Sequence, residues 1–99
     1  MTVRRVVRVT ANFFDQLDAY FAAERGPNGE PSATDFLVLE LPAIVERFAT
    51  DFDALPEIVD GVSAGRMLIT AGVLVRAIAV FGIATSETTV DLIGVTVET

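Results

Sequence analysis

Few side chains of this sequence could carry out chemistry, because it contains seven Arg but no Lys, His or Cys. His and Cys supply the commonest general bases, nucleophiles and zinc ligands. Their absence leaves the arginines, the fourteen Asp and Glu residues and the single Tyr20 as the ionisable side chains available for a site. We therefore assign no catalytic residue, no metal site and no cofactor from the sequence.

Arg66 and Arg76 are the first candidates for binding an anion, because a guanidinium can bind a phosphate or a carboxylate of a partner. With fourteen acids in the chain, both could equally form salt bridges within the domain. An arginine is a poor proton donor because its pKa is high. The two residues therefore indicate charge recognition rather than acid–base catalysis.

Arg4 and Arg8 are the second pair of candidates, since they share one face of the first predicted strand and Arg5 lies beside them. A protein that holds nucleic acid by its phosphates needs a positive surface, whereas the net charge here is −7. We therefore favour a charged edge strand that resists aggregation. Direct binding of nucleic acid is not expected.

Two further groups have ordinary structural interpretations. Tyr20 could act as a general acid, but its position on an apolar helical stripe predicts that it packs in the core. The acidic stretch 51–60 could suggest a metal loop, but Leu55 takes a ligand position and no Gly stands at the sharp turn. We expect this stretch to be a solvated loop.

The length of 99 residues predicts one domain spanning residues 1–99, because a second core would have too little chain to bury. The lack of Cys argues against a small secreted domain. The apolar runs fall short of the ~20 residues that a membrane span needs, and the basic start does not resemble a signal peptide. We expect a cytoplasmic protein without a membrane segment.

The first half of the chain predicts a strand and two helices. Val3–Val9 alternates with period two, as a strand does. Thr10 or Asn12 can cap the helix that follows, and Glu24–Pro27 should end it by its Gly and Pro. A turn is expected at Asn28–Pro31.

Ser32 is expected to cap the second helix, with Asp35 three residues later as in a capping box. This helix should run to about Asp51. Pro42 lies inside it, so the helix is either kinked there or divided into two short helices.

The second half predicts a loop over Asp53–Gly65 and then three strands. Short turns at Ala71-Gly72 and Ser86–Thr88 separate the strands Arg66–Thr70, Val73–Thr85 and Thr89–Val97, with Gly82 as a bulge or bend. Short turns predict an antiparallel meander, and helices on one face give a two-layer α+β domain. Six side chains should form the core between the layers: Phe13, Leu17, Leu41, Ile44, Phe48 and Ile78.

The strand Val73–Ile83 is unusual because it is apolar on both faces. One face would carry Leu74, Ile78 and Val80, and the other Val75, Ala77, Ala79, Phe81 and Ile83. A sheet with helices on one side should have one polar face. We therefore predict a partner-binding face that includes Val75, Phe81 and Ile83, and a chain that forms homo-oligomers or binds another protein.

The order of these elements resembles the ParE/RelE toxin superfamily, the toxin halves of type II toxin–antitoxin modules, which include plasmid stabilisation proteins. The resemblance covers nearly the whole chain and rests on element order and on Arg66 and Arg76, which match family arginines in the first two strands of the meander. The matching segments are Val6–Thr10, Phe13–Phe21, Ala33–Phe52, Gly65–Ile69, Gly72–Val80 and Val90–Val95.

The resemblance implies a divergent, ParE-like toxin, held by a cognate antitoxin. ParE-type members act on DNA gyrase and need no catalytic residues, whereas RelE-type members cleave mRNA on the ribosome and are rich in Lys and Arg. This chain lacks Lys and His, and neutral residues replace the family's final His-Arg pair after Ile93. A RelE-like mRNA endoribonuclease and a non-toxic homodimer that keeps the fold remain the alternatives.

Overall fold

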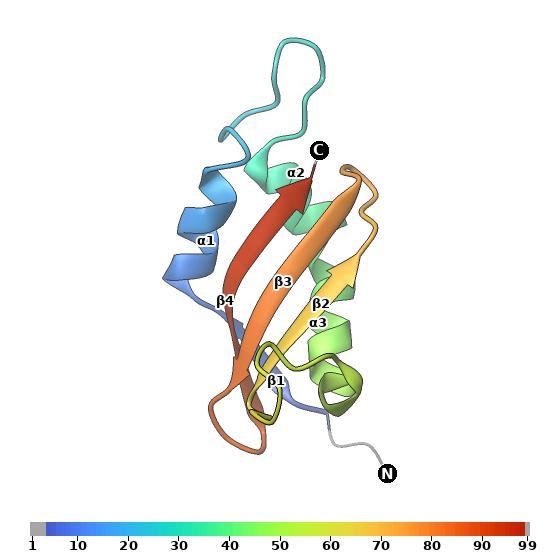
Figure 1. Ribbon diagram of the computed structural model, residues 1–99. Helices are drawn as coiled ribbons and strands as arrows, with labels where there is room; N and C mark the ends of the chain where they lie inside the picture. The colour runs from blue at the N-terminus through green and yellow to red at the C-terminus, as the bar shows by residue number, and fades with distance from the viewer. Residues whose placement is uncertain (1–3, 99) are drawn as a thin grey trace.

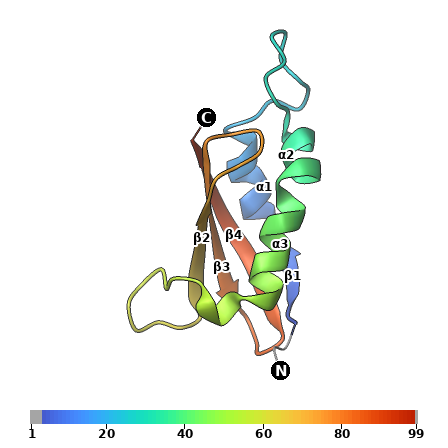
Figure 2. The same cartoon turned by 90° about the vertical axis from the view of Figure 1, so that its right-hand side faces the viewer.

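The computed structural model describes residues 4–98 and arranges them in two layers, a mixed four-stranded sheet and a layer of helices on one of its faces (Figures 1 and 2). The elements are β1 (Val6–Val9), α1 (Ala11–Asp18), α2 (Ala33–Leu39), α3 (Leu41–Thr50), the 3₁₀ turn η1 (Phe52–Ala54), β2 (Gly65–Thr70), β3 (Ala77–Ala84) and β4 (Thr89–Glu98). The expected α+β class is confirmed. None of the helices within residues 4–98 is long and apolar enough to cross a membrane.

The sheet has the strand order β1-β4-β3-β2. Strands β2, β3 and β4 form the expected antiparallel meander. Strand β1 departs from a simple meander, because it pairs in parallel with β4, from Val6 opposite Thr89 to Val9 opposite Leu92. The two edges of the sheet are therefore β1 and β2.

Helix α1 begins as predicted, since the Thr10 hydroxyl accepts a hydrogen bond from the Phe13 N–H at 3.3 Å. It ends at Asp18 and not near Glu24. Because the chain leaves the helix there, Phe21 packs against Phe36 with ring centroids 5.5 Å apart. Tyr20 is consequently exposed, so the prediction that it packs in the core is wrong.

Side chains of α1 bind the edge of β4 beyond the last residue of β1. The Asn12 amide donates to the Ile93 carbonyl at 2.8 Å, and the Gln16 amide oxygen accepts from the Val95 N–H at 2.9 Å. A Cβ at Gly94 would lie 2.9 Å from that amide oxygen, so the glycine permits the close approach. Helix α1 thereby continues the edge pairing that β1 begins.

The second predicted helix is divided in two, which confirms one of the two alternatives left open by Pro42. Ser32 and Asp35 form the expected capping box at the start of α2. Glu40 ends α2 and precedes α3, and Pro42 stands in the first turn of α3. Proline is tolerated there because the first N–H groups of a helix have no partner within the helix.

The predicted core is confirmed, with Leu41 packed against its margin. The other five predicted side chains are fully buried: Phe13, Leu17, Ile44, Phe48 and Ile78. The pairing register shifts between Phe81 and Gly82, as expected for a bulge. A Cβ at Gly82 would lie 2.6 Å from Phe48, so this glycine lets the phenylalanine ring rest on the sheet.

The connection between β2 and β3 is longer than the predicted Ala71-Gly72 turn. Strand β3 begins at Ala77 and not at Val73, because the Glu40 carboxylate binds the backbone N–H groups of Val73 and Leu74. These two residues are therefore held away from the sheet, and the segment 71–76 forms a loop over the end of α2 (Figure 1).

Candidate protein-interaction surface

The face of the sheet that points away from the helices is uncovered (Figure 1). Its side chains alternate with buried ones: Leu68 and Val80 point into the core, so their strand neighbours point outward. Ile69 is 66% exposed and Ile83 is 38% exposed, so no part of residues 4–98 covers these two side chains. We call this surface the outer apolar face and define it by Met67, Ile69, Ala77, Ala79, Phe81 and Ile83.

The loop between η1 and β2 extends the outer apolar face at one end. In Figure 2 this loop projects on the side of the sheet opposite the helices. Ile58 lies against β2, because a Cβ at Gly65 would be 3.5 Å from its Cδ1 atom. Val59 and Val62 are exposed on the same loop. The surface thus consists of apolar side chains of β2 and β3 with an apolar loop beside them.

Two of the three residues predicted for the partner face, Phe81 and Ile83, lie on this surface. Val75 does not, because it precedes β3 and is only 7% exposed within the core cluster. The correction follows from the late start of β3, since Val75 belongs to the loop bound by Glu40 and not to the strand.

All seven arginines have a carboxylate partner, with N–O distances between 2.7 and 4.0 Å. Seven of the fourteen acids are used in this way, and the other seven account for the net charge of −7. The pairs are Arg4–Glu46, Arg5–Asp53, Arg8–Asp91, Arg25–Asp35, Arg47–Asp51, Arg66–Glu57 and Arg76–Glu98. Their positive charge is therefore balanced locally.

Arg66 is used inside the domain. Its side chain is 12% exposed, and its guanidinium donates to the carbonyls of Asp53 at 3.0 Å, Leu55 at 2.8 Å and Ser63 at 2.9 Å. The same group lies 5.6 Å from the centre of the Phe52 ring. Arg66 therefore fastens the loop before β2 to the sheet.

Arg76 is exposed and lies 3.8 Å from Glu98. Arg66 stands opposite Gly82, whereas Arg76 precedes Ala77, the first residue of β3. At ~3.3 Å per residue, these positions are roughly 20 Å apart along β3. The two arginines therefore do not converge on one cleft.

Arg4 and Arg8 are held by different elements. Arg4 precedes β1, which begins at Val6, and donates to Glu46 of α3 at 2.7 Å. Arg8 binds Asp91 of β4 through two hydrogen bonds of 2.8 and 3.1 Å. These hydrogen bonds raise the pKa of both guanidiniums, and the Arg4 bond lowers the pKa of Glu46. The pair therefore forms no joint basic patch.

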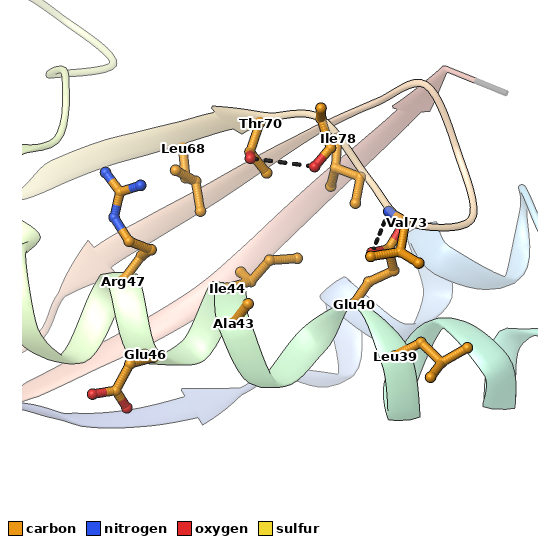
Figure 3. Close-up of a pocket in the computed structure, with 11 residues that line it drawn as sticks. Leu39, Glu40, Ala43, Ile44, Glu46, Arg47, Leu68, Thr70, Val73 and Ile78 are labelled. Carbon is orange, nitrogen blue, oxygen red and sulfur yellow. Dashed lines mark hydrogen bonds between the residues drawn. The ribbon is translucent and has the colours of Figure 1, made fainter.

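A groove of about 360 Å³ lies between α3 and β2, on the helix side of the sheet (Figure 3). Its walls are mostly apolar and include Leu39, Ile44, Leu68 and Ile78, and Glu40 lies at one end beside Val73. Glu40 was not among the site residues predicted from the sequence. The signal was an acid between Leu39 and Leu41, within the apolar stripe of the helix.

Comparisons with protein-family models, with curated proteins and with solved structures found no match to this chain.

Proposed function

We propose that the chain is the toxin component of a type II toxin–antitoxin module, of the ParE-like kind, which acts by binding another protein. The target implied by the resemblance is DNA gyrase. A cognate antitoxin would neutralise the toxin by covering the outer apolar face.

The observation that carries this proposal is the outer apolar face itself. A contiguous exposed apolar patch on a protein surface is typical of a protein-interaction site. Here Phe81 and Met67 stand opposite each other on neighbouring strands, and Ile69 and Ile83 extend the surface in both directions. A protein partner would remove this apolar area from water, which favours association.

The arginines support binding over RNA cleavage. Arg66 is buried against its own loop, and Arg76 lies at the opposite end of β3. A phosphorane would need positive groups that converge on it. The net charge of −7 opposes encounter with RNA and favours a basic protein partner.

The proposal is tested by inducible expression in bacterial cells, with and without the neighbouring open reading frame. Growth, DNA supercoiling and RNA cleavage should be measured in the same cultures. We expect growth arrest and loss of supercoiling without site-specific RNA cuts, and recovery when the neighbouring gene is co-expressed.

Phe81→Glu on the outer apolar face should abolish both toxicity and antitoxin binding. Val38→Glu is the matched control, because Val38 is exposed on α2, away from that face. Normal growth of cells expressing the wild-type chain, at levels confirmed by immunoblot, would refute the proposal. Codon-specific RNA cuts that disappear in Arg76→Ala would instead establish the RelE-like alternative.

A further inference from the structure

The groove beside α3 contains a buried negative charge without a positive partner. Glu40 is 5% exposed, and no arginine among residues 4–98 lies within salt-bridge distance of it. Arg47 lines the same groove but is bound to Asp51 at 3.1 Å. A buried charge without a counter-ion is costly, so such a group is usually paired.

The Glu40 carboxylate is only partly satisfied by the backbone. Its Oε1 and Oε2 atoms accept from the Val73 N–H at 2.8 and 2.9 Å, and Oε2 also accepts from the Leu74 N–H at 3.1 Å. An ionised carboxylate has about four acceptor positions. One position therefore remains for a donor that enters from the groove.

The open edge of β2 runs along this groove. At the start of β2, the edge is occupied by the chain itself, since the Met67 N–H donates to Pro56 and the Ile58 N–H donates to Gly65. Backbone groups of alternate residues point to the same side of a strand, so those of Ile69 also point away from β3. Among the described residues, no strand pairs with that part of the edge.

We propose that this groove binds an extended protein segment with an arginine or lysine among apolar residues. The segment adds to β2 beside Ile69 as an antiparallel strand. Its cationic side chain enters the groove and pairs with Glu40, and its apolar side chains contact Leu68 and Ile44. This inference rests on the proposed function only in that both require a protein partner, because the groove and the outer apolar face lie on opposite sides of the sheet.

The charge of the Glu40 carboxylate favours a segment with a cationic side chain over an apolar or acidic one. The groove end holds one uncompensated carboxylate, and its rim charges, Glu46 and Arg47, are already paired with Arg4 and Asp51. An entirely apolar segment would leave Glu40 buried without a counter-ion, and an acidic one would add repulsion. Arginine fits best, because its planar group offers several N–H donors to the remaining acceptor position.

The test uses the full chain and a synthetic probe, the acetylated and amidated heptapeptide TVTRTVT, in which the arginine and both valines point to the same side of an extended strand. Its comparison peptide has citrulline in place of arginine, which keeps the shape and removes the charge. Affinity is measured by calorimetry, and the site is located by amide chemical shifts. We expect the arginine peptide to bind about 10- to 100-fold more tightly, with shifts in β2 and in residues 71–76.

With Glu40→Gln, the arginine and citrulline peptides should bind with about equal affinity. Because that substitution can loosen the loop 71–76, a second variant leaves Glu40 in place. Ala43→Trp fills the groove from an exposed position of α3 and should abolish binding of both peptides. Val38→Trp, on an exposed part of α2 that does not line the groove, should bind like the wild type.

Equal affinity of the two peptides, no binding at millimolar peptide, or shifts confined to the outer apolar face would each overturn the inference. A failure of the proposed function would give a different combination of results. If the arginine peptide binds in the groove while expressing cells grow normally, the toxin proposal fails and the groove inference stands.

Discussion

The two faces of strand β3 are both apolar but lie in different environments. On the inner face, Ile78 and Val80 are sealed by the helices through Phe13 and Phe48. On the outer face, Ile83 of the same strand is exposed and Phe81 is only partly buried. The difference shows that hydrophobicity of a strand does not by itself identify the core. The apolar stripes of the helices select the face that is buried.

The largest expected effect compares one phenylalanine from each side. Phe48→Ala should lower the free energy of unfolding by about 3–5 kcal/mol, because it leaves a cavity between α3 and the sheet. Phe81→Ala should cost less than Phe48→Ala in a dilute sample, because Phe81 is only partly buried and its truncation leaves no enclosed cavity. Urea denaturation monitored by circular dichroism measures both. Equal losses would mean that the outer face is as tightly packed as the inner face.

The next effect compares two glycines. Gly82→Ala should destabilise the fold by about 1–3 kcal/mol, because the new methyl group would overlap the Phe48 ring. Gly65→Ala should be close to neutral, because its Cβ would lie at an ordinary contact distance of 3.5 Å from Ile58. Thermal unfolding of the two variants gives the comparison. Greater damage from Gly65→Ala would show that the loop before β2, and not the helix layer, packs more tightly on the sheet.

The third effect concerns association through the outer face. We expect the chain to self-associate at high concentration when no other partner is present, because Ile69 and its neighbours remain in water. Ile69→Glu should weaken this association by at least about tenfold, which corresponds to roughly 1.4 kcal/mol. Val38→Glu should leave it unchanged. Sedimentation and light scattering measure the oligomeric state as a function of concentration. A clean monomer at millimolar concentration would contradict the prediction.

Much of the fold was predictable because its signals are local. Thr10 and Ser32 cap their helices through neighbouring N–H groups, and Gly82 marks the register shift in the pairing of β3 with β4. The stripes containing Phe13 and Phe48 predicted the inner face from their spacing alone. Such features depend on residues a few positions apart, which a sequence displays directly.

The features that sequence reasoning missed depend on distant contacts. Glu40 holds Val73, 33 positions away in the chain, and so delays the start of β3 and buries Val75. Arg66 finds its partners in loop carbonyls, which residue types do not reveal. The parallel pairing of β1 with β4 also joins the two ends of the chain. None of these contacts leaves a periodic pattern.

The smallest effect separates the pH response of the periphery from that of the sheet. Hydrogen bonds from Arg25, and then from the Ser32 backbone, hold the pKa of Asp35 well below its usual range. Glu46 has a lowered pKa because of Arg4, and Glu30 has one because of backbone N–H groups. A carboxyl group whose pKa is lower in the folded state stabilises the fold above the unfolded pKa, and this stabilisation disappears as the pH falls through the folded pKa. Stability should therefore decline below about pH 4. The loss should begin at the start of α2, where Asp35 closes the capping box, while the apolar pairing of β3 with β4 persists.

Hydrogen exchange at pH 7 and pH 3 can follow both regions. We expect Asp35→Asn to flatten the pH dependence of protection at α2. The control is Asp15→Asn, at an exposed acid outside the arginine pairs of residues 4–98, which should leave the pH dependence at α2 unchanged. Earlier loss of protection in β3 and β4 than in α2 would show that the sheet, and not its periphery, responds to acid.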